Sequence, residues 1–136
     1  MTGRILDRTA LLDLTSARSV YGAAFLVAAV ERDLELIAPV TALLDAWSAV
    51  PAPDRALLEL LLESPALRVE PLEAATATDA GVRAHDAHRA GASWDAASAH
   101  TVDAARRLGH AILTSDPTPL RTIDPAVGIE QLPDIQ

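Results

Sequence analysis

The 136-residue chain contains no cysteine and no lysine, and only 3% of its residues are aromatic. Without cysteine there is no disulfide, no thiolate zinc site and no cysteine nucleophile, which fits a reducing compartment. Because half of the chain is apolar but few residues are aromatic, Ala, Leu and Val must build the core. That composition favours helices packed on a sheet over an aromatic-rich β-sandwich.

The chain also lacks the positive charge of a general nucleic-acid coat protein, since its net charge is −8. Any contact with RNA must therefore be local or bridged by a metal ion, and the acidic surface suits a basic protein partner. No apolar run is long enough to be a signal peptide or to cross a bilayer. The apolar stretch of residues 21–30, for example, ends in three charged residues. We expect a cytoplasmic protein with no membrane contact.

Apolar runs and helical spacing alternate along the chain, and its length fits a single domain over residues 1–136. Strands are expected at residues 5–6, 34–38, 67–70 and 111–114, with an edge strand at 127–132. Helices are expected at residues 9–14, 19–33, 39–50, 55–63, 73–89 and 94–108, with a short turn of helix at 117–123. Helices between strands require a parallel sheet with right-handed crossovers, so the sequence predicts a three-layer α/β/α fold.

Four aspartates stand where this fold would bring side chains together: Asp7, Asp45, Asp95 and Asp116. Asp7 and Asp116 each follow an apolar run that is typical of a strand, and sites in open parallel sheets form at the carboxyl ends of strands. Carboxylates that converge there repel one another unless a cation lies between them. The pattern predicts a divalent-metal site, and the chemistry usual at such a site is hydrolysis of a phosphate ester.

Each aspartate also has a purely structural interpretation. Asp7 could cap the helix that follows it, and Asp116 could cap the next turn of helix. Asp95 could favour the first turn of a helix whose expected N-cap is Ser93, because a negative charge suits that end of the helix dipole. Asp45 could belong to a polar stripe on the solvent side of its helix. These interpretations stay open for each residue taken alone.

Three segments in the same order resemble the PIN domain, a compact fold of metal-dependent nucleases. They are residues 5–12 (ILDRTALL), 95–102 (DAASAHTV) and 113–117 (LTSDP). The resemblance extends over nearly the whole chain, and within the family the chain is most similar to the short bacterial toxins of VapC type. It implies a small parallel sheet between helices and a metal-dependent endoribonuclease, the toxin of a toxin–antitoxin pair, that cleaves RNA with a metal-activated water.

The resemblance also implies roles for individual residues, all of which carry oxygen donors. The matching residues are the catalytic acids Asp7, Asp45, Asp95 and Asp116, with Thr9 and Ser115 as auxiliary hydroxyls. Asp7, Asp95 and Asp116 would hold Mg²⁺ or Mn²⁺. The implied partners are an RNA substrate, a basic antitoxin protein and a second copy of the chain in a homodimer.

The chain departs from the family pattern at two positions: Asp45 stands where the family has Glu, and Arg8 where it has a small residue. A PIN-like binding module that has lost catalysis is therefore the alternative function. A flavodoxin-like or response-regulator fold also clusters aspartates, but its phosphoacceptor version expects a lysine. Arg8, Arg83 and Arg89 are the candidates for RNA contact, although Arg83 and Arg89 could equally belong to a solvated helix end.

Two further features carry weaker predictions. The helix expected at residues 55–63 has leucines on almost all sides, which predicts either a partner or dimer surface or a deeply buried helix. His100 is expected to pack on the sheet without a catalytic role.

Overall fold

The computed structural model describes residues 2–91 and 93–132, and these form one five-stranded sheet in the order β3-β2-β1-β4-β5. The strands are β1 (Gly3–Leu6), β2 (Glu35–Pro39), β3 (Leu67–Glu70), β4 (Ala111–Thr114) and β5 (Ile129–Gln131). Every pair of neighbouring strands is parallel. The predicted α/β class is confirmed, including the edge strand, which is shorter than expected.

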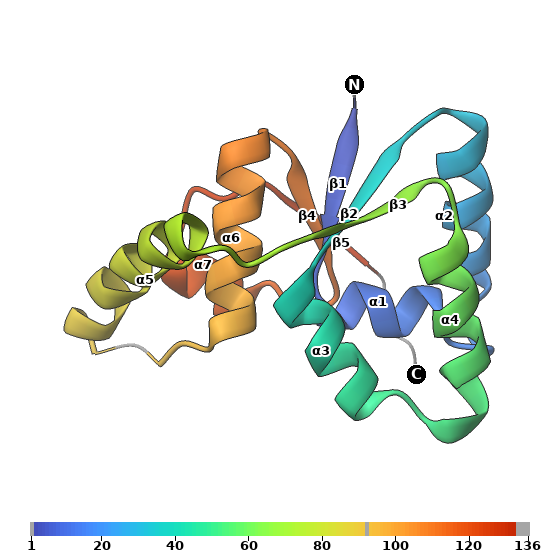
Figure 1. The fold of residues 1–136 in the computed structure, drawn as a ribbon, viewed down its shortest axis with the longest axis horizontal. Coiled ribbons are helices and arrows are strands. Elements are labelled where there is room, and N and C mark those ends of the chain that lie inside the picture. Colours follow the sequence, from blue (N-terminus) through green and yellow to red (C-terminus); the bar gives the residue numbers. More distant parts are fainter. Residues whose placement is uncertain (1, 92, 133–136) are drawn as a thin grey trace.

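Helices connect the strands and cover both faces of the sheet, so the structure has three layers. They are α1 (Arg8–Leu14), α2 (Val20–Glu31), α3 (Val40–Ala49), the 3₁₀ turn η1 (Ala52–Asp54), α4 (Arg55–Glu63), α5 (Ala74–Arg89), α6 (Ala96–Leu108) and α7 (Thr118–Ile123). Figure 1 shows α1 to α4 on one side of the sheet and α5 to α7 on the other. In the part of the chain that the structure describes, no helix is long and apolar enough to cross a membrane.

Two aliphatic cores lie on the two faces of the sheet, because successive residues of a strand point to opposite faces. Leu6 of β1 and Leu113 of β4 pack with α1 to α4. Their neighbours Ile5 and Ile112 point the other way and pack with α5 to α7. All four side chains are fully buried. The sheet is therefore covered on both faces, which is usual for parallel strands and explains their continuous apolar runs.

The start of α6 differs from the sequence prediction. The helix begins at Ala96, and its N-cap is Asp95, whose Oδ1 accepts a hydrogen bond of 2.8 Å from the backbone N–H of Ser98. The prediction of Ser93 as the cap was therefore wrong, because the aspartate is the residue whose oxygen reaches the third amide of the helix. The predicted end is confirmed: Gly109 adopts the left-handed conformation (φ 71°) that closes the helix.

Candidate active site

The candidate site lies at the carboxyl ends of β1 and β4, the two strands at the centre of the sheet. Their register pairs Leu6 with Leu113, so the next residues, Asp7 and Thr114, lie side by side at the end of the two strands. The backbone N–H of Asp7 still donates to the carbonyl of Leu113, at 3.4 Å. A parallel pairing between segments more than 100 residues apart in the chain thus sets the position of Asp7.

Three donors hold the buried Asp7 carboxylate. Its Oδ1 accepts from the hydroxyl of Thr9 (2.6 Å) and from the backbone N–H of Ala10 (2.9 Å), so Asp7 does cap α1. Its Oδ2 accepts from the hydroxyl of Thr114, at 2.5 Å. Each hydroxyl in turn accepts a backbone N–H from the segment after β4, Ser115 to Thr9 and Asp116 to Thr114. Two short hydrogen-bond chains therefore tie this segment to Asp7.

Burial raises the pKa of Asp7 above its ordinary value, and the hydrogen bonds from Thr114, Thr9 and Ala10 lower it by less. Loss of water around the carboxylate is the cause, because an ion in a low-dielectric site is costly. The sequence predicted that repulsion between carboxylates would oppose ionisation at this site. In the structure, the main cause that opposes ionisation of Asp7 is its burial.

Asp95 and Asp116 face the same cleft as Asp7, from different elements. Both are exposed. Ser98 holds Asp95, since its backbone N–H and hydroxyl donate to the two carboxylate oxygens at 2.8 and 2.7 Å. Asp116 does not cap α7, since the N-cap there is Pro117 and no side chain bonds to the helix.

The cleft leaves about 30 Å³ of space for water-sized groups. It is lined by Asp7, Arg8, Thr9, Asp95, Ala97, Ser98, Thr101, Asp116, Pro119 and Leu120. Three of the four predicted acids thus lie around one small polar cleft.

The lining of this cleft includes the predicted Thr9 and Arg8 but not Asp45, Ser115, Arg83 or Arg89. Asp45 is half-buried on α3, one helical turn after Thr41. Arg83 forms an ion pair of 3.3 Å with Asp103 on α6, and Arg89 is exposed in the last turn of α5. Of the three arginines predicted to contact RNA, Arg8 is therefore the one beside the acids, where it is exposed.

Two residues of the site were not predicted. Thr114 donates directly to Asp7, whereas Ser115, the predicted hydroxyl, reaches the site through its backbone N–H to Thr9. Ser98 holds both oxygens of Asp95. Signals for both were present: Thr114 is the last residue of an apolar strand, and Ser98 stands three residues after the aspartate, where the backbone N–H of a helix is free to bond the side chain of the N-cap.

The donors around the cleft are carboxylate and hydroxyl oxygens, the ligand type that Mg²⁺ and Mn²⁺ prefer. Among residues 2–91 and 93–132, no three His, Cys, Asp or Glu side chains lie close enough together to hold a metal ion by themselves. Mg²⁺ keeps several of its waters and is often held by one or two carboxylates. The residues present therefore fit a cation that keeps much of its water shell, with Asp7 and Asp95 or Asp116 as its protein ligands.

The chain matches no protein-family model, and it matches no curated protein. Solved structures do match it over nearly their whole length. VapBC2 from Rickettsia felis, bound to a DNA fragment from its promoter, has a TM-score of 0.76 and 11% identity, with 97% of this chain and 100% of that chain covered. FitAcB from Neisseria gonorrhoeae has a TM-score of 0.64 and 17% identity, with 92% and 94% covered.

FitAB bound to an IR36 DNA fragment has a TM-score of 0.67 and 18% identity, with 93% of each chain covered. The chain shares its fold with VapBC2, FitAcB and FitAB. This result confirms the PIN-like fold that the three sequence segments predicted. At identities of 11 to 18% the likeness is one of fold, so the activity depends on the residues of the cleft.

Proposed function

We propose that the chain is a Mg²⁺- or Mn²⁺-dependent endoribonuclease that acts as the toxin of a toxin–antitoxin pair. One observation carries the proposal: Asp7, Asp95 and Asp116, from three separate elements, border one cleft at the carboxyl ends of two central strands. Carboxylates gathered at such a place are expected to serve a cation and a phosphate.

The residues of the cleft have separate tasks in this mechanism. A bound divalent cation would supply an activated water and neutralise charge on the scissile phosphate. Thr9 and Thr114 hold the two oxygens of Asp7 in place, and Ser98 orients Asp95, so the acids are positioned before any ligand arrives. Arg8, exposed at the rim, is placed to pair with an RNA phosphate.

The proposed protein partner is a basic antitoxin, and the proposed assembly contains a homodimer. The net charge of −8 favours a basic partner. Leu57 and Leu60 on α4 are exposed, as are Val20 and Val27 on α2, so apolar surface is available for a protein contact. VapBC2 and FitAB, which share the fold, were both solved bound to DNA fragments, and this supports a toxin–antitoxin setting.

The decisive experiment is incubation of total RNA and transfer RNA with the purified protein, in Mn²⁺ and in EDTA. We expect cleavage in Mn²⁺ and none in EDTA. Asp95→Asn should reduce the rate at least 100-fold because it removes a ligand charge, yet Asn is as good an N-cap as Asp, so α6 should stay intact. Asp79→Asn, which removes an exposed charge on α5, is the matched control and should retain full activity.

A second candidate function is a binding module without catalysis. Two observations favour it: both oxygens of Asp7 already accept hydrogen bonds, and Asp45 does not line the cleft. A folded protein that binds no Mn²⁺ and cleaves no RNA would establish this function in place of the nuclease. Cleavage that persists in EDTA or in Asp95→Asn would contradict the metal-dependent site.

A further inference from the structure

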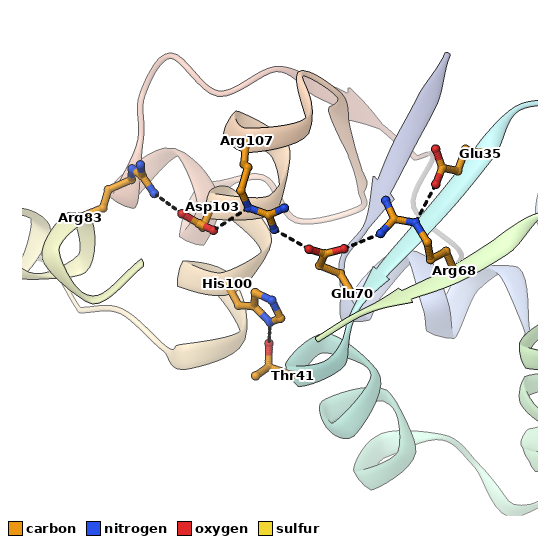
Figure 2. Close-up of polar contacts among 8 residues, drawn as sticks. All are labelled: Glu35, Thr41, Arg68, Glu70, Arg83, His100, Asp103 and Arg107. Carbon is orange, nitrogen blue, oxygen red and sulfur yellow. Dashed lines mark hydrogen bonds and ion pairs between the residues drawn. The ribbon is translucent and has the colours of Figure 1, made fainter. Parts of the chain in front are cut away.

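A charged and polar network joins the edge of the sheet to α5 and α6, on the side of the molecule away from α1 (Figure 2). Its ion pairs run in sequence through Glu35, Arg68, Glu70, Arg107, Asp103 and Arg83. His100 lies beside this network on α6 and is only 1% exposed. This buried imidazole does not line the candidate cleft, and it takes no part in the proposed catalysis.

The His100 ring connects α6 to α3. Its Nδ1 lies 2.8 Å from the hydroxyl of Thr41, the second residue of α3. Within the described residues this is the one side-chain hydrogen bond between the two helices. Figure 2 shows the two side chains meeting where α3 leaves the sheet. The contact thus fixes the first turn of α3 against the middle of α6.

Each of the two helices carries, near this contact in the chain, a residue that lines the cleft or was predicted to serve the site. On α6, Thr101 follows His100 and lines the cleft. On α3, Asp45 lies four residues after Thr41, so the two share one face of the helix. A neighbouring face of α3, which carries Ala42 and Ala46, packs in the apolar core. The position of Asp45 relative to the cleft therefore depends on how α3 stands against α6.

We propose that His100 is a positioning residue: through Thr41 it holds α3 against α6, and so sets the distance of Asp45 from the metal cleft. The role of Asp45 rests on the proposed function, whereas the hold on α3 does not. Asp45, which does not line the cleft directly, would act on the metal through water, at a distance set by the His100–Thr41 pair. Outer partners of this kind typically change metal affinity by 10- to 100-fold when removed.

Burial favours the neutral form of the His100 ring. Burial lowers the pKa of His100 below its ordinary value, while the backbone of Pro71 and the carboxylates of Asp103 and Glu70 oppose that shift and Arg107 adds to it. From α5, Arg83 reaches the same group through its ion pair with Asp103. Within the described residues, His100 Nε2 and Asp103 Oδ2 are both buried without a hydrogen-bond partner, so protonation at Nε2 would change the balance of this network.

The hold on α3 is tested without metal, by amide hydrogen exchange in the first turns of α3. Thr41→Val removes the hydroxyl and keeps the volume, so exchange there should rise about tenfold, while the strands stay protected. His100→Asn places an amide where Nδ1 stands and should keep protection near the wild-type level. The matched control is Thr78→Val on α5, whose hydroxyl donates to the carbonyl of Ala74 in its own helix. Unchanged exchange in Thr41→Val overturns the proposal.

In the wild-type protein, the attachment of α3 to α6 should also depend on pH. In His100→Asn it should not. Because burial lowers the pKa of His100 in the folded state, the opened state gains a proton first as the pH falls below the ordinary value of 6.5, and exchange in α3, corrected for the intrinsic rate, should rise. His100→Asn has no ring to protonate and should give a flat profile. A merely space-filling role for His100 would give the same profile in both proteins, and that result would also overturn the proposal.

The link to Asp45 is tested by calorimetric titration with Mn²⁺ alone, in a double-mutant cycle. Thr41→Val and Asp45→Asn should each weaken Mn²⁺ binding about tenfold, and the double variant should be no weaker than Asp45→Asn. If the losses of Mn²⁺ affinity in the two single variants multiply in the double variant, Thr41 acts independently of Asp45, and the positioning role is overturned. A wild-type protein that binds no Mn²⁺ would overturn the proposed function together with the role of Asp45, and the exchange experiment would still decide the hold on α3.

Discussion

The buried carboxylate of Asp7 lowers the stability of the folded protein, although the proposed metal site depends on it. Its carboxylate is buried, and three hydrogen bonds do not fully replace the water it has lost, since its pKa remains raised. Between the ordinary pKa near 3.8 and the raised folded value, the folded state holds more protons than the unfolded state. The stability associated with Asp7 therefore falls as the pH rises through that window, and it stays lost at neutral pH.

Asp7→Asn should accordingly raise the melting temperature in EDTA at pH 7.5, by about 2–5 °C. The gain should shrink as the pH falls through the window in which the wild-type carboxylate is protonated. Mn²⁺ should raise the melting temperature of the wild-type protein and leave that of the variant unchanged. The exposed Asp116→Asn is the comparison, with little change expected in EDTA. A lower melting temperature for Asp7→Asn in EDTA would mean that the bonds from Thr9 and Thr114 outweigh the cost of burial.

At the scale of elements, two helical glycines have opposite surroundings. Gly22 in α2 is buried, and a Cβ there would lie 2.9 Å from both the carbonyl oxygen of Asp13 and the Cα of Leu14. These are backbone atoms at the end of α1, so they could move only if a whole helix moved. Gly81 in α5 is exposed, and a Cβ there would meet nothing within 4 Å.

We expect Gly22→Ala to lower the free energy of unfolding by about 1–3 kcal/mol, because it forces α1 and α2 apart. Gly81→Ala should raise the free energy of unfolding by about 0.5–1 kcal/mol, since alanine is the better helix former. Urea denaturation of the two variants measures both. Equal effects of the two substitutions would show that helix propensity, and not the close approach of α1 and α2, decides the outcome.

At the scale of the whole molecule, Glu70 ties the outer strand of the sheet to α6. It ends β3, is 7% exposed, and accepts from Arg68 at 2.7 Å and from Arg107 at 2.6 Å. The carboxylate is buried, but the side chains of Arg68 and Arg107 are 46% and 40% exposed, so water still reaches both guanidinium groups when Glu70 is removed. The pair of Arg4 with Glu130, in contrast, is partly exposed and joins β1 to β5.

Glu70→Gln should therefore lower the free energy of unfolding by about 1–2 kcal/mol, a change measured in urea at pH 7.5. Glu130→Gln, the same substitution at a more exposed glutamate, should cost less than about 1 kcal/mol. If the two variants lose comparable free energy of unfolding, burial of Glu70 does not strengthen the contribution of its ion pairs to stability.

Local signals were sufficient for most of the fold. Helix α4 begins and ends at the predicted residues, and Gly109 closes α6 as expected, because capping and periodicity are properties of short segments. The surplus of leucines in α4 was ambiguous. Leu58 and Leu61 are buried in the core beside the sheet while Leu57 and Leu60 are exposed, and only the packing of α4 on the sheet decides which side faces the core.

The amino-acid sequence alone determined the order of strands and helices, the parallel α/β class and the placement of acids after strands, since each of these follows from patterns within a few residues. Tertiary structure decided which acids meet. Thr114 donates to Asp7 across 107 residues of chain, and His100 meets Thr41 across 59. The direction of α3 kept Asp45 out of the lining of the cleft. Such contacts depend on how helices pack on the sheet, and packing is a property of the whole chain.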